Sequence, residues 1–407
     1  MVGLSVHAFP VEIVEVIIDW MDDPDVLLSL ALTSKAFYSL LVPRHTQARI
    51  LRLPLYARCA WLALANDPRL ARNIRSLEIV SLHPVDEKQS LFPNFDDDCL
   101  HCSARLSSGY VDIPSGNKFQ QDSETLLMAA IKNMANLTSF RWKTNLYSTH
   151  LKPSEDVWSQ LASSCPNLTE ISVRESTGGV SYLWDREILS MSNLTVFEFE
   201  TTNVPCYPWD FTRMGPMLRE RCPGLQRLHL ILQYDYSLEV LPADISDAIL
   251  AGRWPHLSSL KFSNVSSTPE AFVAFLHAHP GIVNLAFDNF IACYPIPDLE
   301  DESPFAEDDP LPAPLACDPG ILPNLNNLVC CPGPAIDILA ATLQSTAGER
   351  RIAVKIWLME VNPRLQAFID FAKENTSLEV SSLDHLEKAV DLRDDTMLAE
   401  VAHRYYV

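Results

Sequence analysis

The stretch Cys165-Pro166-Asn167-Leu168-Thr169-Glu170-Ile171-Ser172-Val173 carries the pattern that decides the fold of this 407-residue chain. Its last six residues form a hexad, L-x-x-L-x-L with apolar exchanges, in which apolar and polar residues alternate over the last three positions. Such alternation is typical of a β-strand that buries one of its faces. The proline before the hexad ends the preceding helical turn. The stretch therefore predicts a unit in which a turn leads from a helix into a strand.

The hexad recurs along the chain, behind stretches whose apolar residues have helical spacing. One helix and one strand cannot bury a core alone, so such units stack on their neighbours. The pattern resembles a leucine-rich repeat array with long, uneven spacing. This resemblance implies an α/β solenoid, an irregular horseshoe with a parallel sheet on its concave side. Hexads begin at Leu137, Leu168, Leu194, Leu225, Leu257, Ile282 and Leu325, and an earlier one is predicted at Ile74.

Three Asn-Leu-Thr triplets begin at Asn136, Asn167 and Asn193. In a secreted protein such triplets would be glycan acceptors. All three stand at the same position of the repeat, where the leucine opens the hexad. We therefore expect them to have a structural role in the turn before each strand.

Two segments interrupt the repeats and predict loops. Residues 83–122 have little apolar periodicity, and residues 288–320 carry nine acidic residues and neither lysine nor arginine. After the last hexad, the pattern predicts strands at 352–358 and 378–383 around a helix at 363–374. The predicted organisation is a helical module at 8–50, a linking helix and first repeat-like strand at 51–82, an insertion loop at 83–122, the repeat array at 123–334 and a C-terminal α/β cap at 335–407.

The first 43 residues predict three short helices with a surplus of apolar surface. In the first helix the polar residues Glu12, Glu15 and Asp19 form one narrow stripe, and nearly all other side chains are apolar. Helices follow from Asp23 and Ser34, each again rich in apolar residues. Because so short a segment cannot bury this surface by itself, we expect part of it to face a partner.

The order Phe9-Pro10-Val11-Glu12-Ile13, a leucine-rich second helix and a third helix containing Phe37 resemble the F-box, in the diverged form found in large fungal families. F-box modules dock on the Skp-type adaptor of cullin-containing ubiquitin ligases. The resemblance thus implies a non-catalytic substrate receptor in the cytoplasm, the nucleus or both. The residues expected to contact the adaptor are Phe9, Pro10, Ile13, Ile17, Leu27, Leu28, Leu32 and Phe37.

The polar residues of the predicted strands define a second candidate surface. Side chains between the inward-facing leucines point to the opposite face of the sheet. That face either binds an unidentified target protein or is an ordinary solvated surface. The candidate substrate-binding residues are Arg141, Lys143, Arg174, Glu198, Glu200, His229 and Lys261.

Composition argues against several other functions. With 31 basic and 52 acidic residues the chain has a formal charge of −21, which disfavours nucleic acids and anionic membranes as partners. Only 12 glycines and no phosphate-binding loop disfavour nucleotide cofactors, and we expect no cofactor. The pair Cys99 and Cys102 lacks the second pair that a zinc site needs, and we expect ten reduced cysteines. A repeat scaffold unconnected to ubiquitin ligation and a hydrolase with a dispersed site remain as alternatives.

Overall fold

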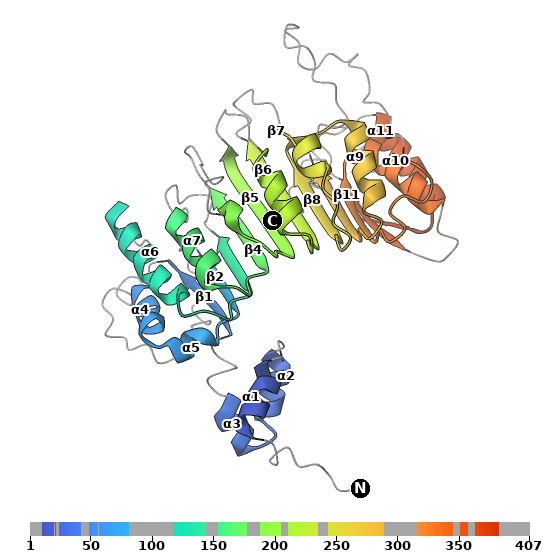
Figure 1. The fold of residues 1–407 in the computed structure, drawn as a ribbon. Coiled ribbons are helices and arrows are strands. Elements are labelled where there is room, and N and C mark those ends of the chain that lie inside the picture. The colour runs from blue at the N-terminus through green and yellow to red at the C-terminus, as the bar shows by residue number, and fades with distance from the viewer. Residues whose placement is uncertain are drawn as a thin grey trace, which may run out of the picture. The chain divides into compact units, whose positions relative to one another are not determined.

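The fold is that of a computed structural model (Figure 1). It describes residues 10–19, 21, 24–41, 49–55, 57–80, 117–143, 154–176, 188–204, 211–234, 243–288, 315, 317–344, 351–356 and 363–381. The chain divides into two compact units, residues 1–175 with 186–188 and residues 176–185 with 189–407.

Parallel strands form the main sheet of this α/β fold, which has eleven strands arranged in chain order. The first unit contributes β1 (Ile50–Pro54), β2 (Ser76–Val80), β3 (Ser139–Lys143) and β4 (Glu170–Ser176). The second contributes β5 (Val196–Val204), β6 (Arg227–Tyr234), β8 (Ser259–Ser263), β10 (Asn284–Asp288), β11 (Asn327–Cys330), β12 (Ile352–Ile356) and β13 (Leu378–Val380). The short strands β7 (Ala243–Asp244) and β9 (Val265–Ser266) pair separately.

From α4 onward, helical segments connect most of the strands and, within each unit, lie on one face of the sheet (Figure 1). The first unit contains α1 (Val11–Asp19), α2 (Pro24–Ala31), α3 (Lys35–Leu41), α4 (Arg58–Asn66), α5 (Pro68–Arg72), α6 (Asn117–Ile131), α7 (Glu155–Ser164) and the start of the 3₁₀ turn η3 (Ile188–Ser190). The second contains α8 (Met214–Pro216), the π-helical turns η4 (Met217–Arg221) and η5 (Ser246–Leu250), α9 (Pro269–Ala278), α10 (Pro332–Leu343) and α11 (Pro363–Glu374).

The hexads position the buried face of the sheet, as the sequence predicts. Their central apolar residues are register partners on neighbouring strands and are almost fully buried. They therefore form a continuous apolar row under the helices of each unit, while the residues between them face the other side. The row contains Leu77, Phe140 and Ile171 in the first unit and Phe197, Leu228, Leu260, Leu285, Leu328 and Val354 in the second.

A repeated hydrogen-bond pattern joins the turns before the strands. The carbonyl oxygen of the second hexad residue accepts the amides of the second and third residues of the next unit. Thus the oxygen of Arg75 accepts from Thr138 and Ser139 at 2.8 and 3.0 Å. The oxygen of Arg49 accepts from Arg75 and Ser76 in the same way, at 2.8 and 2.9 Å. β1 therefore belongs to the series, although no hexad was predicted there.

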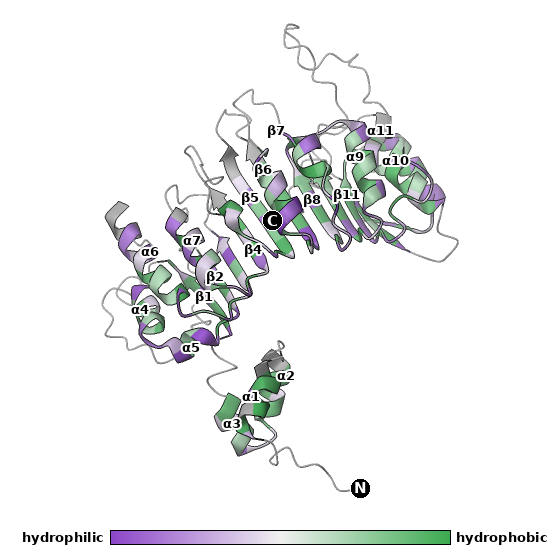
Figure 2. Cartoon of the chain, viewed as in Figure 1, coloured by the Kyte–Doolittle hydropathy of each residue, from purple (hydrophilic) through white to green (hydrophobic). Residues whose placement is uncertain are grey.

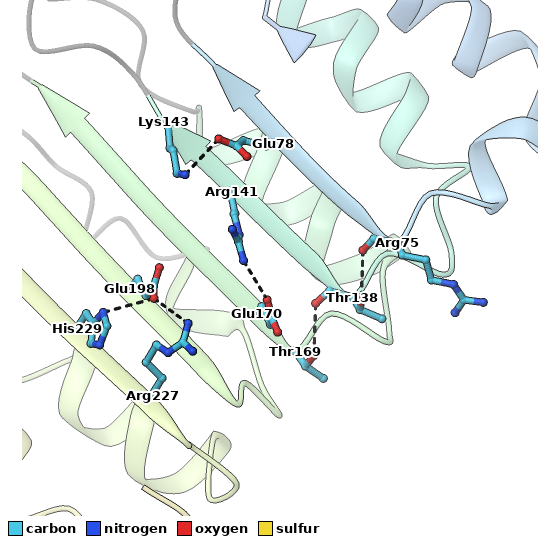
Figure 3. A network of polar contacts seen from close by, with 10 residues as sticks. All are labelled: Arg75, Glu78, Thr138, Arg141, Lys143, Thr169, Glu170, Glu198, Arg227 and His229. Atoms are coloured by element: carbon cyan, nitrogen blue, oxygen red, sulfur yellow. Dashed lines mark hydrogen bonds and ion pairs between the residues drawn. The ribbon is translucent and has the colours of Figure 1, made fainter. Parts of the chain in front are cut away.

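The Asn-Leu-Thr triplets reinforce these turns. The amide nitrogen Nδ2 of Asn167 donates to the oxygen of Ala135 at 3.3 Å, and Asn136 donates to the preceding turn at 3.1 Å. The hydroxyl of Thr138 donates to the oxygen of Arg75 at 3.0 Å (Figure 3). These contacts support the predicted structural role for the first two triplets. Asn193 instead adopts the left-handed conformation, with φ of 61°.

Some predicted boundaries were wrong. Helix α6 begins at Asn117, so the last six residues of the predicted loop 83–122 are helical. Their polar sequence hid a helix because Lys and Gln are good helix formers without an apolar stripe. In the predicted linking region, residues 51–54 belong to β1. The helix 363–374 is confirmed, and the strand predicted from residue 378 ends at Val380, before a turn at Ser381. The described residues of the predicted strand 352–358 form β12, and residues 357 and 358 lie outside them. Residues 81–116, most of the acidic segment and the residues after 381 lie outside the described chain.

Close packing between α8 and η5 yields a test of the fold. A methyl group on Gly215 would overlap the carbonyl oxygen of Ala248, whereas one on Gly224 would meet no atom within 4 Å. We expect Gly215→Ala to lower the free energy of unfolding by roughly 1–3 kcal/mol, because the backbones must separate. Urea denaturation measures this change, with Gly224→Ala as the matched control. Equal unfolding midpoints for the two variants would show that the packing is not tight.

Candidate interaction surfaces

Helices α1–α3 pack around a small core of their own. The fully or almost fully buried residues are Val14, Ile18, Leu27, Ala31 and Leu41. The helices are short, and the buried core takes only one or two side chains from each helix. Most of their remaining side chains are apolar as well, and Figure 2 colours these helices mostly green.

The surplus apolar side chains of these helices form an exposed surface, which we call the N-terminal apolar surface. Its members are about half exposed or more, with exposed fractions of 47–74%. Single exposed apolar residues are common in folded proteins, but this many on three short helices make the N-terminal apolar surface a candidate interaction site. The surface consists of Val11, Ile13, Val16, Ile17, Val26, Leu28, Leu32 and Tyr38.

The predicted adaptor-binding residues fall into three groups. Ile13, Ile17, Leu28 and Leu32 belong to the N-terminal apolar surface, and Pro10 is also exposed. Leu27 is fully buried and Phe37 partly buried against the core, so these two side chains mainly hold the helices together. Phe9 lies outside the described residues.

Sequence reasoning missed four members of this surface, Val11, Val16, Val26 and Tyr38. The spacing of Ile13, Val16 and Ile17 places these three on one helical face, so helical periodicity alone could have identified Val16.

Arg49 is a further structural residue that the sequence did not reveal. Its side chain is buried and donates to the oxygen of Ile18 at 2.6 Å and to that of Met21. These oxygens lie at the end of α1, where a cation is favoured by the helix dipole. Because the carbonyl of Arg49 also accepts the amides of Arg75 and Ser76 at the start of β2, this residue connects the helices to the sheet by hydrogen bonds.

Charged residues line the sheet face of the first unit opposite the helices. Arg52, Glu78 and Arg141 are register partners on β1, β2 and β3. The carboxylate of Glu78 lies 3.5 Å from Nε of Arg52 and 3.2 Å from Nζ of Lys143. Arg141 contacts Glu170 at 3.7 Å (Figure 3). Charges of both signs are thus interleaved across the strands.

A second network lies on the sheet face of the second unit. Glu198, His229 and Lys261 are register partners on β5, β6 and β8. One carboxylate oxygen of Glu198 lies 3.3 Å from the guanidinium of Arg227 and 3.4 Å from Nδ1 of His229 (Figure 3). Nε2 of His229 lies 3.1 Å from the hydroxyl of Ser259.

Burial determines the protonation of His229. It lowers the pKa of this imidazole to about 4, and the charges of Arg227 and Lys261 act in the same direction, while Glu198 opposes them. The ring is therefore neutral near pH 7. Since a carboxylate only accepts hydrogen bonds, Nδ1 carries the proton toward Glu198, and Nε2 accepts from Ser259.

Ser259, His229 and Glu198 have the contacts of a hydrolase triad, and this bears on the hydrolase alternative. A pKa of about 4 makes His229 a weak general base near neutral pH. The backbone amide of Ser259 donates to the oxygen of Gln226, so it is not available to stabilise an oxyanion. Glu198 is shared with Arg227. We therefore interpret the triplet as a polar network of the sheet surface.

The described strands contain all seven predicted substrate-binding residues. Arg174 is exposed and the other six are half-buried. The structure adds Arg52, Glu78, Glu170 and Arg227 to them through ion pairs. Glu170 and Arg227 are third residues of their hexads, which the strand alternation places on the same face as the fifth. Sequence reasoning considered the fifth position and those after it, and so omitted them.

The described part of the chain also bears on metal sites, membrane-spanning helices and cysteine pairs. It contains no group of three or more His, Cys, Asp or Glu side chains placed to hold a metal, and none of its helices is long and apolar enough to span a membrane. Cys99 and Cys102 lie outside it. Cys59 is disulfide-bonded, contrary to the expectation of reduced cysteines. Cys165 is a buried free thiol, and burial raises its pKa to about 12.

The depressed pKa of His229 predicts a pH dependence of stability. In the unfolded chain His229 binds its proton near pH 6.5, and in the folded chain near pH 4. The contribution of the neutral imidazole to the free energy of unfolding is therefore present above pH 6.5 and is lost on acidification through pH 4. Between pH 7 and 5 the loss amounts to roughly 2 kcal/mol. Urea denaturation at both pH values should therefore show a smaller acid loss for His229→Gln than for the unchanged chain.

The exposed His256 provides the control for this measurement. His256→Gln should leave the acid loss unchanged. An acid loss of the same size in His229→Gln and in the unchanged chain would contradict the assignment of a neutral His229.

Comparison with known proteins adds no family assignment: no protein-family model matches the chain, and no curated protein is significantly similar to it in sequence.

Proposed function

We propose that the chain is a substrate-recognition subunit of a Skp–cullin–F-box type ubiquitin ligase. Helices α1–α3 act as the F-box, which docks on the Skp-type adaptor and through it on the cullin. The sheet face opposite the other helices binds a target protein. In this proposal the chain performs no catalysis, needs no cofactor and works in the cytoplasm, the nucleus or both.

The observation that carries the proposal is the N-terminal apolar surface. Seven exposed apolar side chains lie on three helices whose own core has five buried residues, and an eighth, Leu32, directly follows α2. Burying a large apolar side chain contributes about 1.5–3 kcal/mol, so leaving these in water forgoes several kilocalories per mole. A protein partner that covers them would recover this energy. The order of residues from Pro10 to Phe37, which resembles the F-box, indicates which partner that is.

The arrangement of the sheet supports the second part of the proposal. Its strands follow one another in chain order, and helices separate most of them. In a leucine-rich-repeat-like solenoid, this order arises because each unit stacks on its predecessor. We therefore assign the sheet to the concave side of an irregular horseshoe. Solenoids commonly use that side for binding.

Adaptor binding tests the proposal. Ile17→Asp and Leu28→Asp each place a charge in the exposed apolar surface, which a docked partner would have to desolvate. Leu62→Asp on α4 is the matched control, because Leu62 is 49% exposed, as Leu28 is, but lies outside this surface. We expect each of the first two variants to weaken co-purification with a Skp-type adaptor at least about tenfold, a change of 1.4 kcal/mol. Leu62→Asp should bind normally.

Circular dichroism and urea denaturation establish whether each variant folds. An unchanged chain that does not bind the adaptor would refute the proposal and favour a repeat scaffold unconnected to ubiquitin ligation. Equal loss of binding in all three variants would show that the N-terminal apolar surface is not the docking site.

A further inference from the structure

The sheet face of the first unit carries more positive than negative charge. Its strands present the four cations Arg52, Arg141, Lys143 and Arg174 and the two carboxylates Glu78 and Glu170. This local excess lies in a chain whose formal charge is −21. We call the six side chains the basic patch.

Exposure strengthens this excess. The side chain of Glu78 is 16% exposed and lies between Arg52 and Lys143, which are 45% and 42% exposed. Solvent therefore meets the cations more than this carboxylate. Arg141 is exposed to a similar extent as its partner Glu170. The charge that these six side chains present to solvent is therefore net positive.

The register of β3 and β4 adds an independent observation. Lys143 and Arg174 are direct partners on these strands, so two like charges stand side by side. An anionic ligand placed between them would interact with both cations at once. This makes this end of β3 and β4 the centre of the patch.

The second unit lacks such an excess among its described side chains. On the same face, Arg227, Lys261 and Lys355 stand with Glu198, Glu200 and Glu379, three cations with three carboxylates. His229 is neutral there. The positive excess is therefore particular to β1–β4, and the second unit offers matched controls.

We propose that the basic patch binds an extended acidic segment, rich in Asp and Glu, of the target protein. That the acidic segment belongs to a target protein rests on the proposed function. That the basic patch binds an acidic segment does not. Neighbouring strands lie about 4.8 Å apart, and an extended peptide presents side chains on one side about every 6.6 Å. A segment lying across the strands can thus bring successive carboxylates to cations on β1, β3 and β4. Cations spread over several strands suit several single charges better than one phosphate, which requires converging donors.

Peptide binding to the full-length chain tests this proposal. The probe is a fluorescein-labelled peptide of about twelve residues with alternating Glu and Ser, and fluorescence anisotropy measures its affinity. Lys143→Ala combined with Arg174→Ala should weaken binding about tenfold and reduce its dependence on salt, because two cations at the centre of the patch are lost. Lys261→Ala combined with Lys355→Ala removes the same charge from the second unit and should leave the affinity within about twofold.

Two further peptides and one variant complete the test. A control peptide in which Gln replaces every Glu should not bind. Equal affinity for the Gln and the Glu peptides would overturn the proposal. Binding of a phosphoserine peptide without binding of the Glu peptide would also overturn it, in favour of a phosphorylated ligand. Equal losses of affinity for the Glu peptide in the two double variants would also overturn the proposal. Ile17→Asp should bind the Glu peptide normally, so failure of adaptor docking and failure of the basic patch are separate results.

Discussion

The structure depends on the parallel register between successive hexads. In most of the described turns a single carbonyl oxygen accepts two amides of the next turn, and this contact sets which residues become partners on neighbouring strands. A shift of one residue would move every apolar side chain to the other face. The same register that buries the leucines therefore aligns the charged residues in rows on the opposite face. The strand register therefore determines both the packing of the core and the position of the candidate binding surface.

The two candidate surfaces differ in how they can achieve binding. The N-terminal apolar surface gains energy from any partner that removes it from water, so its affinity depends on buried area and shape. The sheet face carries charges of both signs, several of which pair with one another within the chain. Such a face contributes little affinity by itself but discriminates strongly between charged partners. The proposed receptor would need such a division, because it would stay attached to one constant partner while selecting another.

Local patterns predicted most of the fold, and long-range contacts account for what was missed. The alternation in each hexad predicted the strands of the main sheet from β2 to β11, but not β7 and β9, because strand side chains repeat every two residues. It missed β1, whose place in the series depends on Arg49 contacting a turn that lies 26 residues later. Leu27 was assigned to the docking surface because composition shows that helices are apolar but not which of their leucines meet in the core. The ion pairs of Glu78 join three strands, and no local pattern predicts them.

The overall charge of the chain affects how a basic patch on it can work. At a formal charge of −21 the chain repels an acidic protein at long range, so the patch does not accelerate encounter. Salt screening limits both the repulsion by the whole chain and the attraction by the patch to about 8 Å at physiological ionic strength. Attraction by Arg52, Arg141, Lys143 and Arg174 therefore acts only once a segment lies against the sheet. A ligand must then offer its carboxylates in an extended form, because a compact acidic domain would bring more repulsion from the rest of the chain than attraction from these four cations. The patch on this chain consequently selects for local charge in an accessible, unfolded segment rather than for an acidic protein as a whole.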